Sequence, residues 1–209
     1  MPTLYYSPHT RSSRVIAQLM LIGKLDQVEV VTVDVVRHDG SGRHDPSNPH
    51  PEGKVPYLVT DDGTGIRESA AIMMYLDELF GQPLSPAIGA PGRGAYLSWM
   101  AYSGGVLEPV LVAAFAGLDH PAIIETFRGM GELSAVLEQG AQKGPFLLGA
   151  ELSVADILLA SPFQWAPHLL PDSPAIKAWV DRVDSRLDGA AIAAYEASAM
   201  AQLTAQETA

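Results

Sequence analysis

The sequence contains no cysteine among its 209 residues, which excludes a structural disulfide, a zinc–thiolate site and a cysteine nucleophile. Basic residues are few, 13 against 24 acidic ones, and no basic cluster is present to bind nucleic acid. No apolar stretch reaches the roughly 20 residues of a membrane span. The N-terminus also shows no basic segment followed by an apolar run. We therefore expect a cytoplasmic protein that binds neither nucleic acid nor a membrane.

A metal site is not expected either. The six histidines are scattered, and although His38 and His44 share one polar loop with Asp39 and Asp45, their spacing matches no compact metal motif. At 47% hydrophobic, the chain can build full cores for one or two domains without such support.

The first 80 residues alternate strand and helix signals. A short apolar run at 4–7 is followed by the helical spacing of Val15, Leu19 and Ile22, and then by the β-branched residues of 28–33. Residues 37–53 are polar and rich in glycine and proline, which predicts a loop with at most a short helix. A hairpin across 61–64 and an amphipathic helix ending near residue 81 complete this part.

The rest of the chain reads differently. Residues 81–92 form a linker rich in proline and glycine, and after it the strand signals vanish. We therefore predict a domain of residues 1–80, a linker of 81–92 and an all-helical domain of 93–209. Within the helical domain, Ser153 and Asp156 form a capping box, which is a folding device, and Pro162 should kink the helix that follows.

The most informative segment runs from Asn48 to Leu58 and precedes Glu68 and Ser69 at a helix start. A cis Val55–Pro56 bond, which costs little, would turn the backbone N–H and C=O of Val55 outward as an edge for an extended peptide. The two side chains and the helix N-terminus could then hold an ammonium and a carboxylate. Such a segment is typical of a receptor for a zwitterionic peptide.

Three signals in one order resemble the glutathione S-transferase family over nearly the whole chain. They are the start Leu-Tyr-Tyr-Ser-Pro at 4–8 with Arg-Val-Ile at 14–16, the Gly-Lys-Val-Pro segment with Glu-Ser, and the late capping box at 153–157. The resemblance implies a thioredoxin-like N-terminal domain of order βαβ-α-ββα, followed by an all-α C-terminal domain. It also implies a homodimer.

This family uses glutathione as a thiolate, and the resemblance places the group that stabilises it between the first strand and the first helix. Relatives with a catalytic serine place it some four residues before the arginine of the Arg-Val step, a position held here by Thr10. Ser12 is the next candidate, with Tyr6, Ser7 and Arg11 as further alternatives. A serine or threonine before a helix can also serve only as its cap.

The remaining site residues follow from the same resemblance. Glutathione would be bound by Lys54, Val55, Pro56, Glu68 and Ser69. The second substrate, a small hydrophobic electrophile, would bind between the domains near His9 and Tyr102.

The resemblance thus predicts a glutathione transferase that ionises the thiol and conjugates it to an apolar electrophile, with glutathione as co-substrate and no metal. Two alternatives stay open. One is a non-catalytic family member that binds ligands or acts as a scaffold, because threonine replaces the usual catalytic residue. The other is a glutathione-dependent enzyme that cleaves ethers or removes halogens.

Overall fold

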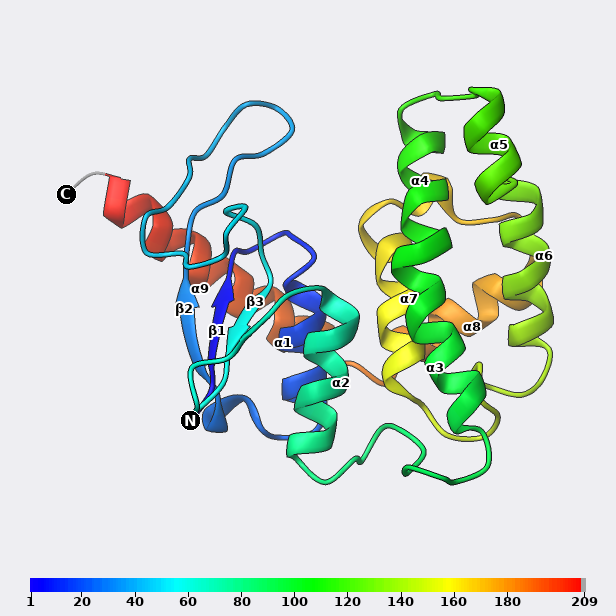
Figure 1. Cartoon of the computed structure of the whole chain (residues 1–209), viewed down its shortest axis with the longest axis horizontal. Coiled ribbons are helices and arrows are strands. Elements are labelled where there is room, and N and C mark those ends of the chain that lie inside the picture. Colours follow the sequence, from blue (N-terminus) through cyan, green and yellow to red (C-terminus); the bar gives the residue numbers. More distant parts are fainter. Residues whose placement is uncertain (208–209) are drawn as a thin grey trace. The chain divides into compact units, whose positions relative to one another are not determined.

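The structure, a computed structural model, describes residues 1–207 of the chain. It divides the protein into two compact units (Figure 1). The first unit combines Met1–Phe80 with Leu187–Ala209, and the second is Gly81–Arg186.

The first unit is built on a mixed sheet of four strands, in the order β2-β1-β3-β4. The central strand β1 runs parallel to β2 and antiparallel to β3, which in turn pairs antiparallel with β4. This is the sheet expected of the predicted thioredoxin-like domain. The strands are β1 (Thr3–Tyr6), β2 (Glu29–Thr32), β3 (Tyr57–Val59) and β4 (Gly65–Ile66).

Two helices of this unit pack against each other, α1 (Ser13–Leu21) and α2 (Ser69–Leu79). Side chains alternate along β1, so Leu4 and Tyr6 are fully buried while Thr3 and Tyr5 are partly exposed. A buried hydrogen bond from Gln18 Nε2 to the carbonyl of Met73 joins the helices. A short helix, η1 (Leu25–Gln27), leads into β2. The apolar core of this unit includes Leu4, Val15, Ile16, Leu19, Leu58, Ile72 and Leu76.

One predicted element is missing. Residues 33–56, between β2 and β3, form turns without a helix. Glycines with positive φ, including Gly40, Gly42 and Gly53, and the prolines at 46, 49 and 51 interrupt any helical run here. At Gly42 an added Cβ would lie 2.1 Å from the carbonyl oxygen of Val35, so the chain folds back there as only glycine allows.

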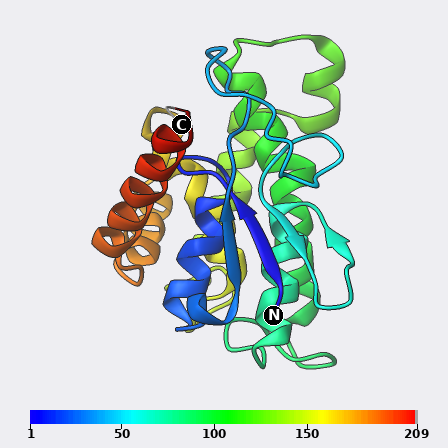
Figure 2. The ribbon, with the colours of Figure 1, turned by 90° about the vertical axis from the view of Figure 1, so that its left-hand side faces the viewer.

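The last helix, α9 (Gly189–Glu207), belongs to the first unit, whereas the predicted boundaries put residues 93–209 in one helical domain. It packs beside α1 and against β2 (Figure 2). Tyr195 meets the ring of Tyr6 edge-on at 5.7 Å, and Thr32 donates a hydrogen bond to Gln202 at 3.3 Å. These contacts explain why the helix lies with the sheet although an all-helical segment precedes it.

The second unit is all-helical, as predicted. Its largest fully buried side chain is Trp179, whose indole Nε1 donates to Asp156 at 2.9 Å. The elements are α3 (Arg93–Tyr102), η2 (Ser103–Leu107), α4 (Glu108–Phe115), α5 (Pro121–Phe127), α6 (Met130–Ala141), α7 (Val154–Trp165), η3 (Pro167–Leu169) and α8 (Pro174–Asp184).

The predicted capping box is confirmed at the start of α7. One carboxylate oxygen of Asp156 accepts the N–H of Ser153 at 2.9 Å, and the other accepts the N–H of Leu147 at 2.8 Å. Pro162 lies inside α7, near its end. Because a proline nitrogen carries no hydrogen, it cannot donate to the carbonyl of Leu158, and the hydroxyl of Ser161 donates to that carbonyl instead. Both features stabilise the fold.

Helices α3, η2 and α4 form one continuous helix, Arg93–Phe115, of 23 residues, and its most apolar 18-residue stretch has a mean hydropathy of 1.2. By length and composition it could span a membrane, which the sequence pattern did not suggest. Its buried side chains, among them Tyr96, Met100 and Leu107, pack in the core of the second unit. The core helix of a soluble protein meets the same two criteria.

Candidate active site

The strand pairing brings four segments to one end of the sheet. Because β3 is antiparallel to β1, its beginning at Tyr57 pairs with Tyr5, close to the end of β1. The end of β4 at Ile66 pairs with Leu58, and the parallel β2 ends beside β1. The loops that follow β1, β2 and β4 therefore meet the loop that precedes β3 (Figure 2). These loops carry the predicted catalytic and glutathione-binding residues.

The first of these loops, between β1 and α1, contains both predicted catalytic hydroxyls. Thr10 is partly exposed, and its Oγ1 lies 2.7 Å from the carbonyl oxygen of Ser7 and 2.6 Å from Oγ of Ser12. The same oxygen accepts the N–H of Ser12 at 3.2 Å. The single hydroxyl proton of Thr10 thus has two possible acceptors within the loop. To donate to a ligand, the hydroxyl would have to give up its hydrogen bond to these acceptors.

Ser12 is fully buried. Its Oγ accepts the N–H of Ser7 at 3.1 Å and donates to the carbonyl of Ser7 at 2.8 Å, which closes the loop. α1 begins at the next residue without a side-chain cap. Of the two predicted hydroxyls, the geometry therefore leaves only that of Thr10 accessible.

The loop after β2 adds a cation that the sequence reasoning missed. The guanidinium of Arg37 donates to the carbonyl of Pro8 at 3.4 and 3.5 Å and to Oγ of Ser7 at 3.4 Å. Arg37 is partly buried. Arg37 lies 30 residues from Ser7 in the sequence, and no local sequence pattern predicts that the two side chains meet.

A carboxylate on α9 was missed as well. Glu196 accepts the hydroxyl of Tyr6 at 3.4 Å, the N–H of His9 at 3.2 Å and the hydroxyl of Ser13. Its Oε2 also lies 3.0 Å from Nδ1 of His9, and its side chain is only 12% exposed. Burial, together with the charge of Glu196, raises the pKa of Tyr6 far above its ordinary value. Tyr6, an alternative catalytic donor, is thus a neutral, buried hydroxyl bonded to Glu196.

The segment before β3 has the expected backbone. The Val55–Pro56 peptide bond is cis. Within residues 1–207, neither the N–H nor the C=O of Val55 has a hydrogen-bond partner. Pairing of β3 with β1 begins only at Tyr57, two positions later. The backbone of Val55 is therefore available to an extended ligand.

Lys54 is paired in this structure. Its ammonium lies 2.6 Å from Oε2 of Glu52, and Nη1 of Arg67 lies 3.8 Å from the other oxygen of the same carboxylate. A hydrogen bond from Lys54, followed by the charge of Lys54, lowers the pKa of Glu52. The Lys54 side chain is 70% exposed, so a ligand carboxylate can compete for it.

Glu68 and Ser69 stand at the start of α2. Glu68 has φ 69° and ψ 125°, a sparsely populated conformation for a residue other than glycine. Neither side chain makes a hydrogen bond to another described residue. Backbone strain of this kind clusters at ligand-binding positions. The two side chains are thus free to bind a ligand beside the positive end of α2.

Buried polar residues hold this region in place. His50 accepts the N–H of Glu52 at 2.9 Å, and its ring meets Tyr57 edge-on at 5.1 Å. Burial lowers the pKa of His50, which keeps the imidazole neutral as that acceptor. Asn48 donates to the carbonyl of Lys54 at 3.1 Å. The Lys54 side chain therefore projects from a turn whose backbone is held by these contacts.

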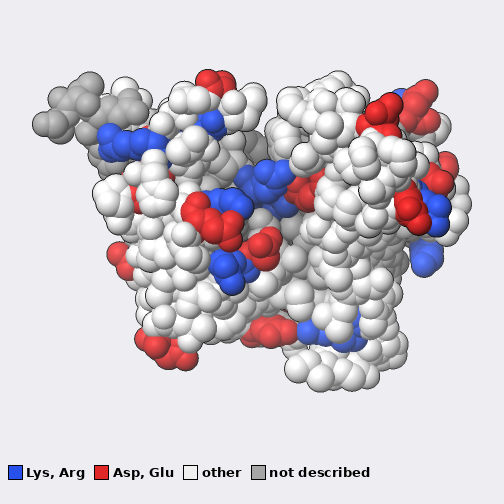
Figure 3. All heavy atoms as spheres, turned by 45° about the horizontal axis from the view of Figure 1, so that its top comes forward, with Lys and Arg blue, Asp and Glu red and all other residues white. Residues whose placement is uncertain are grey.

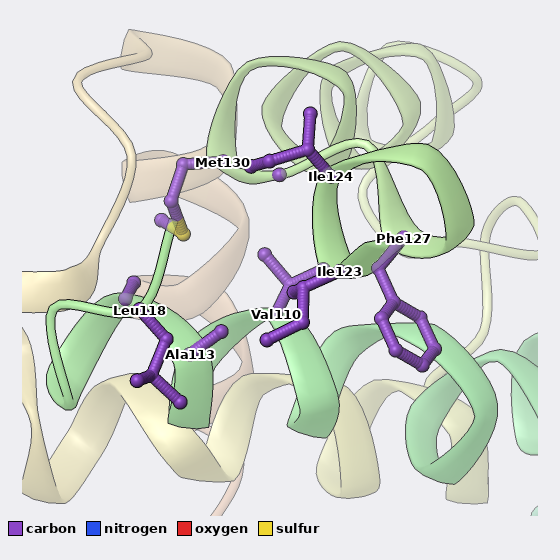
Figure 4. Close-up of a pocket in the computed structure, with 9 residues that line it drawn as sticks. Val110, Ala113, Leu118, Ile123, Ile124, Phe127 and Met130 are labelled. Atoms are coloured by element: carbon purple, nitrogen blue, oxygen red, sulfur yellow. The ribbon is translucent and has the colours of Figure 1, made fainter. Parts of the chain in front are cut away.

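In the second unit, Tyr102 meets Trp99 edge-on at 5.6 Å, and burial raises its pKa. A separate apolar cavity of about 140 Å³ lies between α4, α5 and the start of α6 (Figure 4). Tyr102 does not line it. Its lining includes Val110, Ala113, Leu118, Ile123, Ile124, Phe127 and Met130. No group of three or more potential metal ligands occurs in the described part of the chain.

Known proteins share this architecture. The family model of the glutathione S-transferase N-terminal domain matches residues 2–84, and that of the C-terminal domain matches residues 122–182. Glutathione S-transferase F10 of Arabidopsis thaliana is 30% identical over 200 residues, covering 87% of this chain and 91% of its own. The chain belongs to the glutathione S-transferase family.

Solved structures agree with this assignment. A glutathione transferase from Methylococcus capsulatus superposes with a TM-score of 0.73 at 26% identity, covering 94% of this chain and 99% of its own. A sphingomonad glutathione S-transferase complexed with glutathione also gives 0.73 at 26% identity, covering 93% and 98%. The predicted thioredoxin-like and all-helical architecture is confirmed.

Proposed function

We propose that this protein is a glutathione transferase that binds glutathione at the end of the sheet described above and uses its thiolate to attack an apolar electrophile. The observation that carries the proposal is the meeting of four loops, which brings Thr10, Val55 and Glu68 to one end of the same sheet. Glutathione would lie extended along Val55 beside the supporting Pro56, with its charged groups at Lys54, Glu68 and Ser69. Its sulfur would lie near Thr10.

The chemistry needs a lowered thiol pKa. A free thiol has a pKa of about 8.5, and lowering that pKa by one corresponds to about 1.4 kcal/mol of added preference for the thiolate. The Thr10 hydroxyl, the N-terminal end of α1 and the Arg37 guanidinium each favour a negative sulfur at this loop. This local field matters because the chain carries a net charge of −11, and basic and acidic side chains lie interspersed on the face in Figure 3.

Relatives support glutathione as the ligand. The sphingomonad enzyme was solved with glutathione, as was a transferase homologue from Sulfitobacter that shares the fold. In this chain, the side chains of Lys54, Glu68 and Ser69 offer the charges and hydrogen bonds that the two ends of such a peptide require. We propose no metal in the reaction.

Ultraviolet absorbance of bound glutathione thiolate, recorded from about pH 5 to 9, tests the proposal. A thiolate band that persists at about pH 6–7, below the titration of the free thiol, would establish binding and activation together. Bound glutathione that titrates as it does in water would overturn the catalytic part. Absence of binding would overturn the whole proposal.

Tyr102 of the second unit is kept as a proposed contact of the second substrate. Tyr102→Ala should raise the KM for an apolar aromatic electrophile while leaving the KM for glutathione unchanged, because Tyr102 lies in a different unit from the glutathione-binding residues. Trp99→Phe, which keeps the aromatic neighbour of Tyr102, is the matched control. A rise in the KM for glutathione instead would remove Tyr102 from the pocket.

We also propose a homodimer. Val112 and Phe115 on α4 are 51% and 63% exposed, large values for apolar side chains on a helix of this hydropathy. Light scattering coupled to size exclusion gives the mass directly. A monomer at micromolar concentration would refute the proposal.

A cytoplasmic location stays a prediction.

A further inference from the structure

The imidazole of His9 is held by a carboxylate from the far end of the chain. Nδ1 of His9 lies 3.0 Å from Oε2 of Glu196, and the backbone N–H of the same histidine donates to Oε1 at 3.2 Å. His9 has φ 56°, an uncommon conformation outside glycine. One carboxylate thus fixes both the backbone and the ring of a residue adjacent to Thr10.

This contact defines which ring nitrogen carries the proton. An ionised carboxylate only accepts hydrogen bonds, so the Nδ1 that faces Glu196 must donate. In a neutral imidazole, Nε2 then keeps its lone pair and can accept a proton. The His9 side chain is 60% exposed, whereas that of Glu196 is 12% exposed. The group that can accept a proton, Nε2 of His9, is therefore on the more accessible of the two side chains.

The other groups around Glu196 support this state. Tyr6 and Ser13 donate their hydroxyl protons to the carboxylate. Burial raises the pKa of Tyr6 and that of Tyr195, so both phenols are neutral and neither takes the proton from a thiol. Arg37 adds a positive charge to this loop, where it bonds to Pro8 and Ser7. The Glu196 carboxylate thus accepts hydrogen bonds from two hydroxyls and one backbone N–H and also faces Nδ1 of His9, so it is placed to orient the imidazole.

We infer that His9 is the proton acceptor for the glutathione thiol and that Glu196 is its positioning residue. The S–H bond breaks, the sulfur keeps the electron pair as a thiolate, and the proton forms a new bond to Nε2 of His9. The imidazolium then faces the Glu196 carboxylate, and it gives up its proton to solvent only after the thiolate has reacted with the electrophile. This inference rests on the proposed function, because it assigns a step at the same site.

Calorimetry of glutathione binding to the whole protein at about pH 7.5, in buffers of different ionisation enthalpy, counts the protons released. Thiolate absorbance counts the thiolate formed. If His9 takes the proton, thiolate appears with clearly less than one proton released per thiolate. One proton released per thiolate overturns the inference while leaving the proposed function intact. Absence of binding overturns both.

Two variants isolate the groups. His9→Asn should lower kcat/KM by about 10²-fold, the lower end of what a general base contributes, and restore full proton release for whatever thiolate forms. Glu196→Gln keeps the size, but its amide can donate to Nδ1 and so select the tautomer that blocks Nε2. It should lower kcat and flatten the acidic limb of the pH–rate profile, with the KM for glutathione little changed.

The matched control is His168→Asn, an exposed histidine of the second unit, which should keep parental rates and proton release. Circular dichroism and thermal unfolding check that each variant folds. A folded His9→Asn protein with parental rate and parental proton release would contradict the inference. So would a Glu196→Gln protein that lost rate with an unchanged pH profile, because that loss would be structural only.

Discussion

The ammonium of Lys54 lies 2.6 Å from the carboxylate of Glu52, so the cation expected to bind glutathione is already paired within its own turn. Arg67 reaches the other oxygen of the same carboxylate at 3.8 Å. A ligand carboxylate must therefore compete with Glu52 for both cations. We therefore expect this local ion pair to weaken the binding of a ligand carboxylate modestly.

Removing the competitor should strengthen binding. Glu52→Gln should lower the Kd for glutathione by about two- to fivefold, because exposed ion pairs are weak and a ligand regains only part of the released attraction. Lys54→Ala should raise the Kd, and the double variant should resemble Lys54→Ala. Calorimetric titration measures all three. A Glu52→Gln protein that binds more weakly would show that Glu52 supports the site.

The two catalytic candidates can be separated because one is exposed and one buried. Thr10→Val removes the accessible hydroxyl and should lower kcat/KM by about ten- to a hundredfold with a raised thiol pKa, while Thr10→Ser should keep most of the rate. Ser12→Ala should instead lower the free energy of unfolding by about 1–3 kcal/mol, since it leaves the N–H of Ser7 without its acceptor. Steady-state kinetics and urea unfolding distinguish these effects. Equal activity of Thr10→Val and parent would remove Thr10 from catalysis.

The proposed glutathione-binding residues lie close together in sequence, so their meeting at one end of the sheet could be predicted. Lys54, Val55 and Glu68 flank one hairpin, whose short-range pairing carries them to the same end of the sheet. The capping box at Ser153 and Asp156 is equally local. The local structure of such motifs depends on residues close in sequence, so it can be predicted without knowing the contacts of the rest of the chain.

Glu196 and α9 show where that reasoning stops. The helix is rich in alanine and carries no clear apolar stripe, so its sequence does not say which unit it covers. The contact of Glu196 with His9 joins positions 187 residues apart. Arg37 likewise meets Ser7 across 30 residues and a whole helix. Such pairs follow from packing that only the folded chain defines.

The strained backbone at Glu68 should lower the stability of the fold. Glu68→Gly relieves the positive φ and should raise the free energy of unfolding by about 1 kcal/mol, the lower part of the cost of such strain. Glu68→Ala keeps the strain. Both variants lose the carboxylate and should bind glutathione more weakly to a similar extent. Chemical unfolding and calorimetry on the pair give the two quantities; equal stability of the Gly and Ala variants would refute strain at this position.

The loop before Lys54 should loosen in acid. Burial, the largest single effect, raises the pKa of Asp45, but hydrogen bonds from Ser47 and from the N–H of Asp34 outweigh it, and the pKa is lowered overall. A lowered folded-state pKa means that this carboxylate stabilises the fold above its unfolded pKa of about 3.9 and loses that contribution as the pH falls through the folded value. The hydrogen-exchange protection factors of residues 34–48, corrected for the intrinsic rate at each pH, should therefore fall below about pH 4. Asp45→Asn should show the lower protection factors at neutral pH already and little further change in acid. Unchanged protection in the variant would mean that the turns of this loop, and not its carboxylate, hold the chain beneath Lys54.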